Sequence, residues 1–186
     1  MKEFKRKQFP PEWEWLLKEP GPNILLEALK QYGILEHPGI GSFANFDQWT
    51  KELDVDDVMT DDDIPWCGVF VGIAAMRAGW DVPYACYRAK NWLNFGNPID
   101  LPELGCVVVF ERPRGHHVGL YIAESTTHYA ILGGNQGNSV NISLIDKSRA
   151  IGARECPWRV AKPGNVRRIY INKHLASTVH RTDNEA

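Results

Sequence analysis

Residues 64–76 have the sequence IPWCGVFVGIAAM, a stretch without a charged side chain. A helix that is apolar on every side is a buried helix. Proline is favoured in the first turn of a helix, because the N–H groups there have no partner within the helix and proline lacks this group. Because Pro65 comes just before Cys67 and the apolar pattern stops at Gly79, the stretch predicts a buried helix that begins at Cys67.

The sequence on either side of this helix differs in hydrophobic period. Upstream, apolar residues recur at helical spacing in three segments, around 13–17, 24–34 and 46–53. Downstream, short runs bounded by turn residues predict strands at 106–110, 117–123, 128–132 and 140–145. Helices followed by antiparallel strands are typical of an α+β fold. We expect one domain over 1–160, with a helical part at 1–60 and the cysteine helix and sheet at 61–160, followed by a basic tail at 161–186.

Length and charge exclude several classes of protein. The chain has 186 residues and is 44% hydrophobic, as expected for one globular domain. Its 21 basic and 23 acidic side chains give a net charge of −2, so we expect no nucleic-acid partner. No apolar run approaches the roughly 20 residues of a membrane span, and the N-terminus lacks the apolar stretch of a secretory signal. We therefore expect no integral membrane segment and synthesis in the cytoplasm without a signal peptide.

The cysteines suggest a nucleophile rather than a metal site. They are scattered and form no Cys-x-x-Cys pair, so we expect no metal and no other cofactor. They stand at Cys67, Cys86, Cys106 and Cys156. A thiol at a helix start gains from the helix dipole, which lowers its pKa, and this favours Cys67 as the nucleophile. The alternative is that Cys67 is only a small buried apolar residue.

The strand after residue 115 offers the histidine partner. His117, Gly119 and Tyr121 share one face of this strand, and Gly119 leaves that face open to the end of a helix, so His117 is expected to meet Cys67 there. His116 points the opposite way. An amide orients such an imidazole in papain-like peptidases.

The identity of that amide depends on hairpin register. A three-residue loop at 125–127 places Asn135 opposite His117, whereas a two-residue loop places Gln136 there. The segment around both residues, 133–137, has the sequence GGNQG, which is also the composition of a plain turn.

Three strings together resemble a known family. They are Pro-Trp-Cys before the apolar helix, GHHVGLY at 115–121 and LGGNQ at 132–136. They resemble the cysteine, histidine-dependent amidohydrolase/peptidase (CHAP) family and its NlpC-like relatives, in particular a phage-associated subgroup, over about residues 24–158.

The resemblance implies a papain-like α+β fold that cleaves amide bonds of bacterial peptidoglycan. In it Cys67 would be the nucleophile, His117 the base and Asn135 the orienting residue. Many members carry a glutamate two residues before this asparagine, where this chain has Gly133, so the third role rests on Asn135. The implied protein is an endolysin-like monomer whose partner is the cell wall. It would reach the wall in the periplasm through a separate pore or when cells break.

Four further residues are candidates for substrate contact. Trp66 and Trp92 would line the groove, although tryptophans in such a chain usually lie in the core. Gln136 would contact substrate, and Asp63 would contact substrate or cap the cysteine helix.

The sequence leaves several functions open. The enzyme could be an N-acetylmuramoyl-L-alanine amidase or a peptidoglycan endopeptidase. An antibacterial effector with the same chemistry and a non-catalytic wall-binding protein of the same fold are further alternatives.

The C-terminal segment carries positive charge only. Between Trp158 and Thr182 there are six basic side chains and no acidic one. They are Arg159, Lys162, Arg167, Arg168, Lys173 and Arg181. The segment is either a solvated end or an electrostatic contact for anionic envelope polymers.

Overall fold

The computed structural model describes residues 7–36, 44–60 and 64–171. Helices come first: η1 (Pro11–Lys18), α1 (Asn23–Leu29), α2 (Ala44–Glu52), α3 (Cys67–Arg77) and η2 (Ala89–Asn94). Strands follow: β1 (Asn97–Ile99), β2 (Val107–Arg112), β3 (Gly115–Glu124), β4 (His128–Gly133), β5 (Asn141–Asp146) and, after η3 (Lys147–Arg149), β6 (Ala150–Glu155). The predicted α+β order is confirmed.

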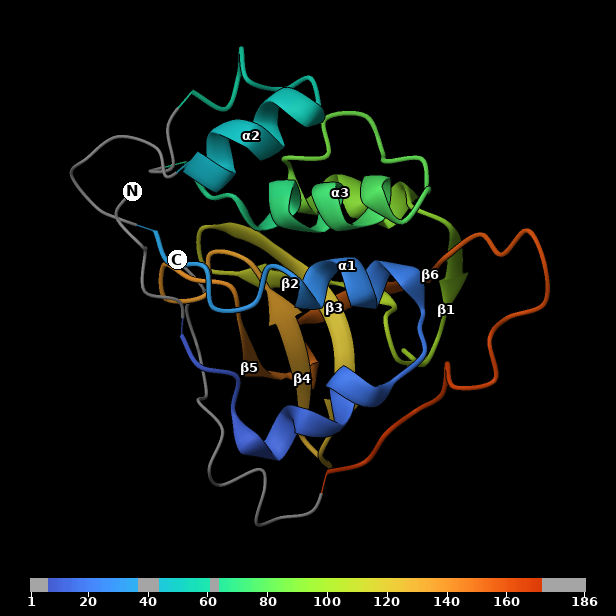
Figure 1. Cartoon of the computed structure of the whole chain (residues 1–186). Helices are drawn as coiled ribbons and strands as arrows, with labels where there is room; N and C mark the ends of the chain where they lie inside the picture. The colour runs from blue at the N-terminus through green and yellow to red at the C-terminus, as the bar shows by residue number, and fades with distance from the viewer. Residues whose placement is uncertain (1–6, 37–43, 61–63, 172–186) are drawn as a thin grey trace.

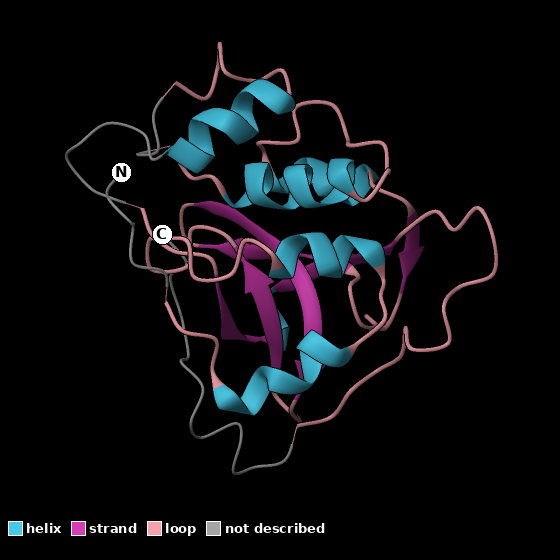
Figure 2. Cartoon of the chain, viewed as in Figure 1, coloured by secondary structure: helices cyan, strands magenta, loops and turns pink. Residues whose placement is uncertain are grey.

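The strands form one antiparallel sheet in the order β1-β6-β2-β3-β4-β5. Helix α1 lies in front of the sheet, α3 runs above it and α2 lies above α3 (Figure 1). Figure 2 shows the helices gathered over one side of the strands. The main apolar core fills the space between them, and a smaller cluster, built around Phe110, Tyr121 and Ile131, covers the other face.

Helix α3 is the buried centre of the main core, as predicted. Every residue from Cys67 to Ala75 is buried. The helix contacts α1, α2 and β3. It ends where Gly79 adopts a positive φ of 82°, which an L side chain rarely tolerates. Burial of each large apolar side chain stabilises the folded state by about 1.5–3 kcal/mol. The buried side chains of α3 therefore hold the layer of helices against the sheet.

The segment after residue 160 is part of the domain up to Ile171. It leaves β6 and runs around the molecule back to β3 (Figure 1). There Glu124 N–H donates to the Ile169 carbonyl and Ile171 N–H donates to the Glu124 carbonyl, each at 2.8 Å. The expected boundary at residue 160 therefore does not separate a tail from the domain.

Three of the six basic residues in this segment are ion-paired. Lys162 pairs with Glu103 at 2.5 Å, Arg167 with Glu19 at 3.0 Å and Arg168 with Glu124 at 2.8 Å. Arg159 lies over the Trp80 ring, and Lys173 and Arg181 lie outside the described residues. Because acidic partners within the domain hold these charges, the idea of an open basic contact for wall polymers loses most of its support.

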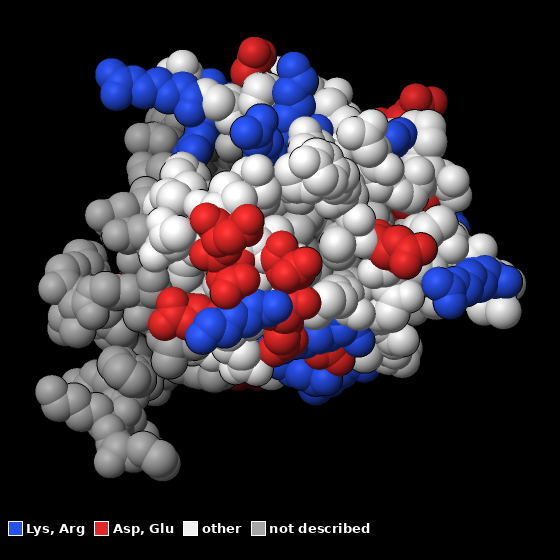
Figure 3. All heavy atoms as spheres, turned by 90° about the horizontal axis from the view of Figure 1, so that it is seen from above, with Lys and Arg blue, Asp and Glu red and all other residues white. Residues whose placement is uncertain are grey.

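The face above α2 carries charges of both signs (Figure 3). Glu52 at the end of α2 and the following Asp54, Asp56 and Asp57 are exposed, and Arg77 pairs with Glu52 at 2.7 Å. This face therefore offers no continuous basic surface to a polyanion. Within the described part of the chain, no helix combines the length and the apolar character needed to cross a membrane.

Candidate active site

Cys67 is the first residue of α3 and lies against β3. Its side chain is 2% exposed, and its sulfur is hydrogen-bonded to the backbone of Val118, the residue after His117. The backbone groups of Cys67 and Gly68 also interact with the sulfur. The helix start therefore delivers the thiol to the strand that carries the candidate base.

The pKa of the Cys67 thiol is raised, not lowered. Burial is the main cause, because it disfavours the thiolate. The hydrogen bond to Val118 and the positive charge of Arg112 act in the opposite direction and are outweighed. The expectation that the helix dipole would lower this pKa was therefore wrong in sign, since it left out desolvation.

His117 is fully buried on β3, on the face away from α3. It is the cross-strand partner of Phe110, and the two ring centroids lie 6.5 Å apart. Helix α3 packs on the opposite face, that of Val118 and Leu120. The open face expected at Gly119 is filled, because a Cβ there would lie 2.4 Å from the Ile131 side chain. Cys67 thus meets the strand at the backbone of Val118, the residue after His117.

Gln136 is the amide that contacts His117. Its Oε1 lies 3.2 Å from His117 Nε2. Its Nε2 donates to the Asn141 carbonyl at 2.7 Å and, more weakly, to the carbonyls of Ile131 and Gly133. A carbonyl only accepts, so these bonds fix the Gln136 nitrogen toward the backbone and its oxygen toward His117. In a neutral imidazole Nε2 then carries the proton, and Nδ1 is the basic nitrogen.

Gly133 is required by this contact. A Cβ at this position would lie 2.9 Å from Gln136 Oε1 and 3.1 Å from His117 Nε2. The next residue, Gly134, is equally confined, because its Cβ would lie 2.6 Å from Trp66 and from Phe70. Position 133 therefore has no room for a side chain in this arrangement.

The hairpin contains both of the registers considered from the sequence. Near the loop Glu124 pairs with Tyr129, the register of a two-residue loop, and beyond a shift between Tyr121 and Ala123 the other register holds. That second register points to Asn135, but β4 ends at Gly133. Asn135 has a positive φ of 55° and turns the chain, so Gln136 reaches His117 instead.

The two tryptophans expected to line a groove belong to the core. Trp66 and Trp92 are both 0% exposed. Trp66 Nε1 donates to Glu36 Oε2 at 2.9 Å, and Trp92 Nε1 donates to the Cys86 carbonyl at 2.8 Å. Neither presents a surface to a substrate in this structure. Asp63, the remaining candidate for substrate contact, lies outside the described residues.

Arg112 and Glu36 were not assigned a role from the sequence. Arg112 ends β2 and pairs with Gly115 at the turn before His117, and its charge acts on the Cys67 thiol. The sequence could have pointed to Arg112, because it is a basic residue in a tight hairpin close to a histidine. Glu36 belongs to the segment that pairs with 138–140, and it holds Trp66, the residue before Cys67. Only tertiary structure links it to the site.

The described residues contain no group of three His, Cys, Asp or Glu side chains that could hold a metal ion. All four cysteines are reduced. The groups that the structure places here are the Cys67 thiol, the His117 imidazole and the backbone at the start of α3. Among known proteins, no family model matches the chain and no curated protein is significantly similar to it.

Proposed function

We propose that the protein is a cysteine-dependent amide hydrolase that uses Cys67, His117 and Gln136. The observation that supports this most is the bond between Gln136 Oε1 and His117 Nε2. This bond keeps the proton on Nε2, so Nδ1 carries no proton and points away from the amide. A base that accepts a proton from a thiol needs such a nitrogen. Cys67 lies beside this residue at the start of α3, the place where backbone N–H groups lack helical partners.

The proposed reaction is acyl transfer through a thioester. The proton of the Cys67 sulfur passes to His117 Nδ1, which requires the imidazole to move from its place on the other face of β3, and the sulfur attacks the amide carbonyl carbon. The oxyanion is held by the Cys67 backbone N–H, with the positive charge of Arg112 nearby. His117 then gives the proton to the leaving amine. A water molecule, deprotonated by His117, hydrolyses the thioester and regenerates the thiol.

The proposed substrate is the peptidoglycan of the bacterial cell wall. This assignment rests on the resemblance of the Cys67, His117 and Gln136 segments to CHAP and NlpC-like sequences. The scissile bond is either the one between muramic acid and L-alanine or one within the peptides. The enzyme would act on the wall after release from the cytoplasm.

A non-catalytic wall-binding protein is the second candidate. It is favoured by the 2% exposure of Cys67 and by its raised pKa. A protein that retained the fold without the reaction would be free to bury its thiol in this way.

Purified sacculi distinguish the two candidates. The full chain should release muropeptides, whose masses and new termini identify the bond. Cys67→Ala should abolish release, whereas Cys86→Ala, which alters an equally buried thiol, should retain it. His117→Ala should lower the rate on the order of a hundredfold or more, and His116→Ala should have little effect. Binding of sacculi without hydrolysis would favour the second candidate, and a lytic Cys67→Ala protein would refute the first.

A further inference from the structure

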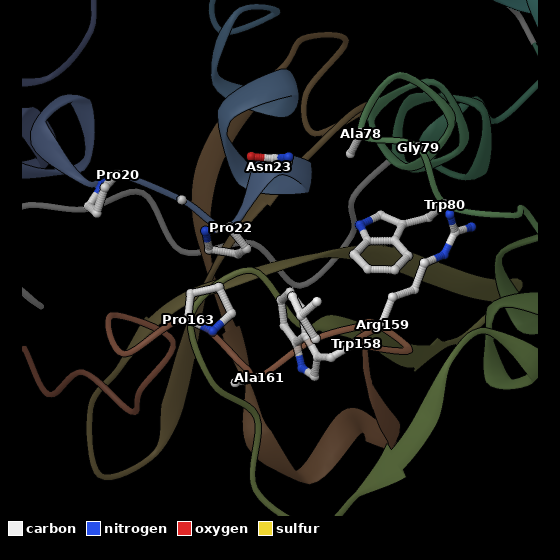
Figure 4. A pocket seen from close by; sticks show the side chains of 12 residues that line it. Pro20, Pro22, Asn23, Ala78, Gly79, Trp80, Trp158, Arg159, Ala161 and Pro163 are labelled. Carbon is white, nitrogen blue, oxygen red and sulfur yellow. The ribbon is translucent and has the colours of Figure 1, made fainter.

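A pocket lies at the far end of α3 from Cys67. It has a volume of about 410 Å³, a size within the range of roughly 300–1,000 Å³ that small-molecule sites occupy. Its walls come from the chain that enters α1 (20–23), the end of α3 (78–80) and the segment 158–163 (Figure 4). Since α3 has 11 residues, this pocket lies about 16 Å along the helix from the candidate nucleophile.

Two tryptophans give the pocket its aromatic surfaces. The rings of Trp80 and Trp158 meet edge to face, with centroids 5.7 Å apart and an interplanar angle of 87°. Both side chains are half-buried, and three prolines, at 20, 22 and 163, also line the pocket. Most other tryptophans of the chain are wholly buried in the core. These two instead leave part of an aromatic face accessible from the pocket.

The pocket also contains a hydrogen-bond donor that needs an acceptor. Trp80 Nε1 is buried and has no hydrogen-bond partner among the described residues. In Figure 4 the nitrogen-bearing edge of this indole faces across the pocket toward Asn23. By contrast, Trp158 Nε1 bonds to Glu155 at 3.3 Å. A buried donor without an acceptor is costly, so a ligand that brings a carbonyl oxygen to Trp80 gains affinity.

The charge of the pocket has one sign. Arg159 is the single charged residue of its lining, and its guanidinium lies 5.9 Å from the centroid of the Trp80 ring. The N–H groups of a guanidinium form a fork that matches a carboxylate, so Arg159 can pair with an acidic group of a ligand. The positive charge of Arg159 also repels a cationic ligand.

We propose that this pocket binds an N-acetylated sugar ring of the glycan strand. The apolar C–H face of the ring stacks on an indole, and the acetamido carbonyl accepts from Trp80 Nε1. A carboxylate on the peptide arm of the same unit pairs with Arg159. That the ligand is part of peptidoglycan rests on the proposed function. That the ligand has a ring, a carbonyl group and a carboxylate rests on the residues of the pocket.

A proline-rich peptide is the less suitable occupant. Such peptides bind as extended helices along grooves with successive aromatic-lined sites, and this is one compact pocket. A sugar ring fills a compact site and still offers polar edges to Trp80 and Arg159. A glycan held here would keep the wall close to the start of α3 and so raise the local concentration of amide bonds.

Binding of soluble saccharides to the full-length Cys67→Ala protein tests the pocket without requiring hydrolysis. The probes are N-acetylglucosamine trimer, which lacks a carboxylate, and N-acetylmuramyl dipeptide, which has one. Indole N–H signals in an ¹H–¹⁵N spectrum report binding, and the Trp80 signal should shift with both. Trp80→Phe, which keeps a ring and removes the N–H, should weaken both about fivefold.

Two further variants and a control complete the test. Trp158→Ala should weaken both probes about tenfold, and Arg159→Gln should weaken the muramyl dipeptide alone. Trp15→Phe, which alters a tryptophan outside the pocket, should bind as the parent protein does. Unchanged affinity in the three pocket variants, or binding of a proline-rich peptide in place of the saccharides, would overturn the proposal. Saccharide binding by a protein that never hydrolyses sacculi would support the pocket while refuting the proposed function.

Discussion

The orientation of one amide decides which nitrogen of His117 is basic. Gln136 holds its own nitrogen on backbone carbonyls and turns its oxygen to His117 Nε2. Gln136→Ala removes this constraint, and we expect kcat for muropeptide release to fall on the order of a hundredfold, as misplaced catalytic groups do.

Asn135→Ala is the matched control, because Asn135 turns the chain next to Gln136, whereas Gln136 Oε1 is the amide oxygen that lies 3.2 Å from His117 Nε2. It should lower kcat much less, provided the variant retains the melting temperature of the parent. A larger loss in Asn135→Ala than in Gln136→Ala would return the orienting role to Asn135.

Reactivity of the thiols tests the electrostatics around Cys67. The four thiols are equally buried, and burial raises the pKa of Cys86 to about 11 and those of Cys106 and Cys156 to about 12. Cys67 has the charge of Arg112 close by, whereas carboxylates of Glu103 and Glu155 raise the pKa of Cys106 further.

We therefore expect iodoacetamide to modify Cys67 first, as read by peptide mass spectrometry. Arg112→Gln should slow this modification, while Arg114→Gln, which changes a neighbouring exposed arginine, should not. Modification of all four thiols at one rate would contradict this role of Arg112.

At the residue scale the sequence predicted which residues to consider but not how they meet. Cys67 follows a helix-start signal, and His117 belongs to a clear strand, so both were found. The choice between Asn135 and Gln136 depended on a register shift after Tyr121 and on where β4 ends. Neither is encoded in a local pattern. The burial that raises the pKa of Cys67 is likewise a property of the whole fold.

At the scale of elements, the strongest periodic signals were the most predictive. Helix α3 and strands β2 to β5 were found because they are apolar runs bounded by turn residues. Strand β6 was missed, because the sequence AIGARE of residues 150–155 has little apolar character. It forms because β1 and β2 pair with it on both sides. The segment up to Ile171 was taken for a tail for a similar reason, since its contacts are all long-range.

Glu124 attaches this C-terminal segment to the sheet. Its side chain is 1% exposed and accepts hydrogen bonds from Tyr121, Lys147 and Arg168. These bonds hold the Glu124 pKa below its usual value despite burial, which acts to raise it. Glu124→Gln should lower the free energy of unfolding by about 2 kcal/mol, because the partners Lys147 and Arg168 are partly exposed and can turn to water.

Urea denaturation measures this change, and limited proteolysis should show earlier cleavage near Arg168. Glu103→Gln provides the control, because its ion pair with Lys162 is partly exposed on both sides. It should cost less than about 1 kcal/mol. Equal losses in the two variants would show that Glu124 has no special part in holding the segment.

At the scale of the whole molecule, buried groups that ionise only at high pH determine how stability varies with pH. The pKa values of all four thiols are raised by burial. Burial also raises the pKa of Tyr32 to about 12 and that of Tyr121 further. In the unfolded chain a thiol ionises near 8.5 and a tyrosine near 10. The folded chain therefore retains protons above pH 8.5 that the unfolded chain has lost.

This difference fixes the sign of the effect. Where the unfolded state binds fewer protons than the folded state, the free energy of unfolding falls as pH rises. The stabilising contribution of these groups is fully present below about pH 8 and is lost progressively above it. Each thiol contributes a slope of about 1.4 kcal/mol per pH unit between its unfolded and folded pKa values.

Urea midpoints measured from pH 7 to 10.5 should therefore be level up to about pH 8 and then fall steeply. Cys106→Ala removes one of these thiols, so its curve should fall less steeply above pH 9, whatever its stability at pH 7. Spectrophotometric titration of thiolate in the folded protein provides an independent check, since ionisation should coincide with unfolding. A midpoint constant to pH 10.5, or thiolate formation in the folded state near pH 8.5, would show that the thiols are not held in the core as described.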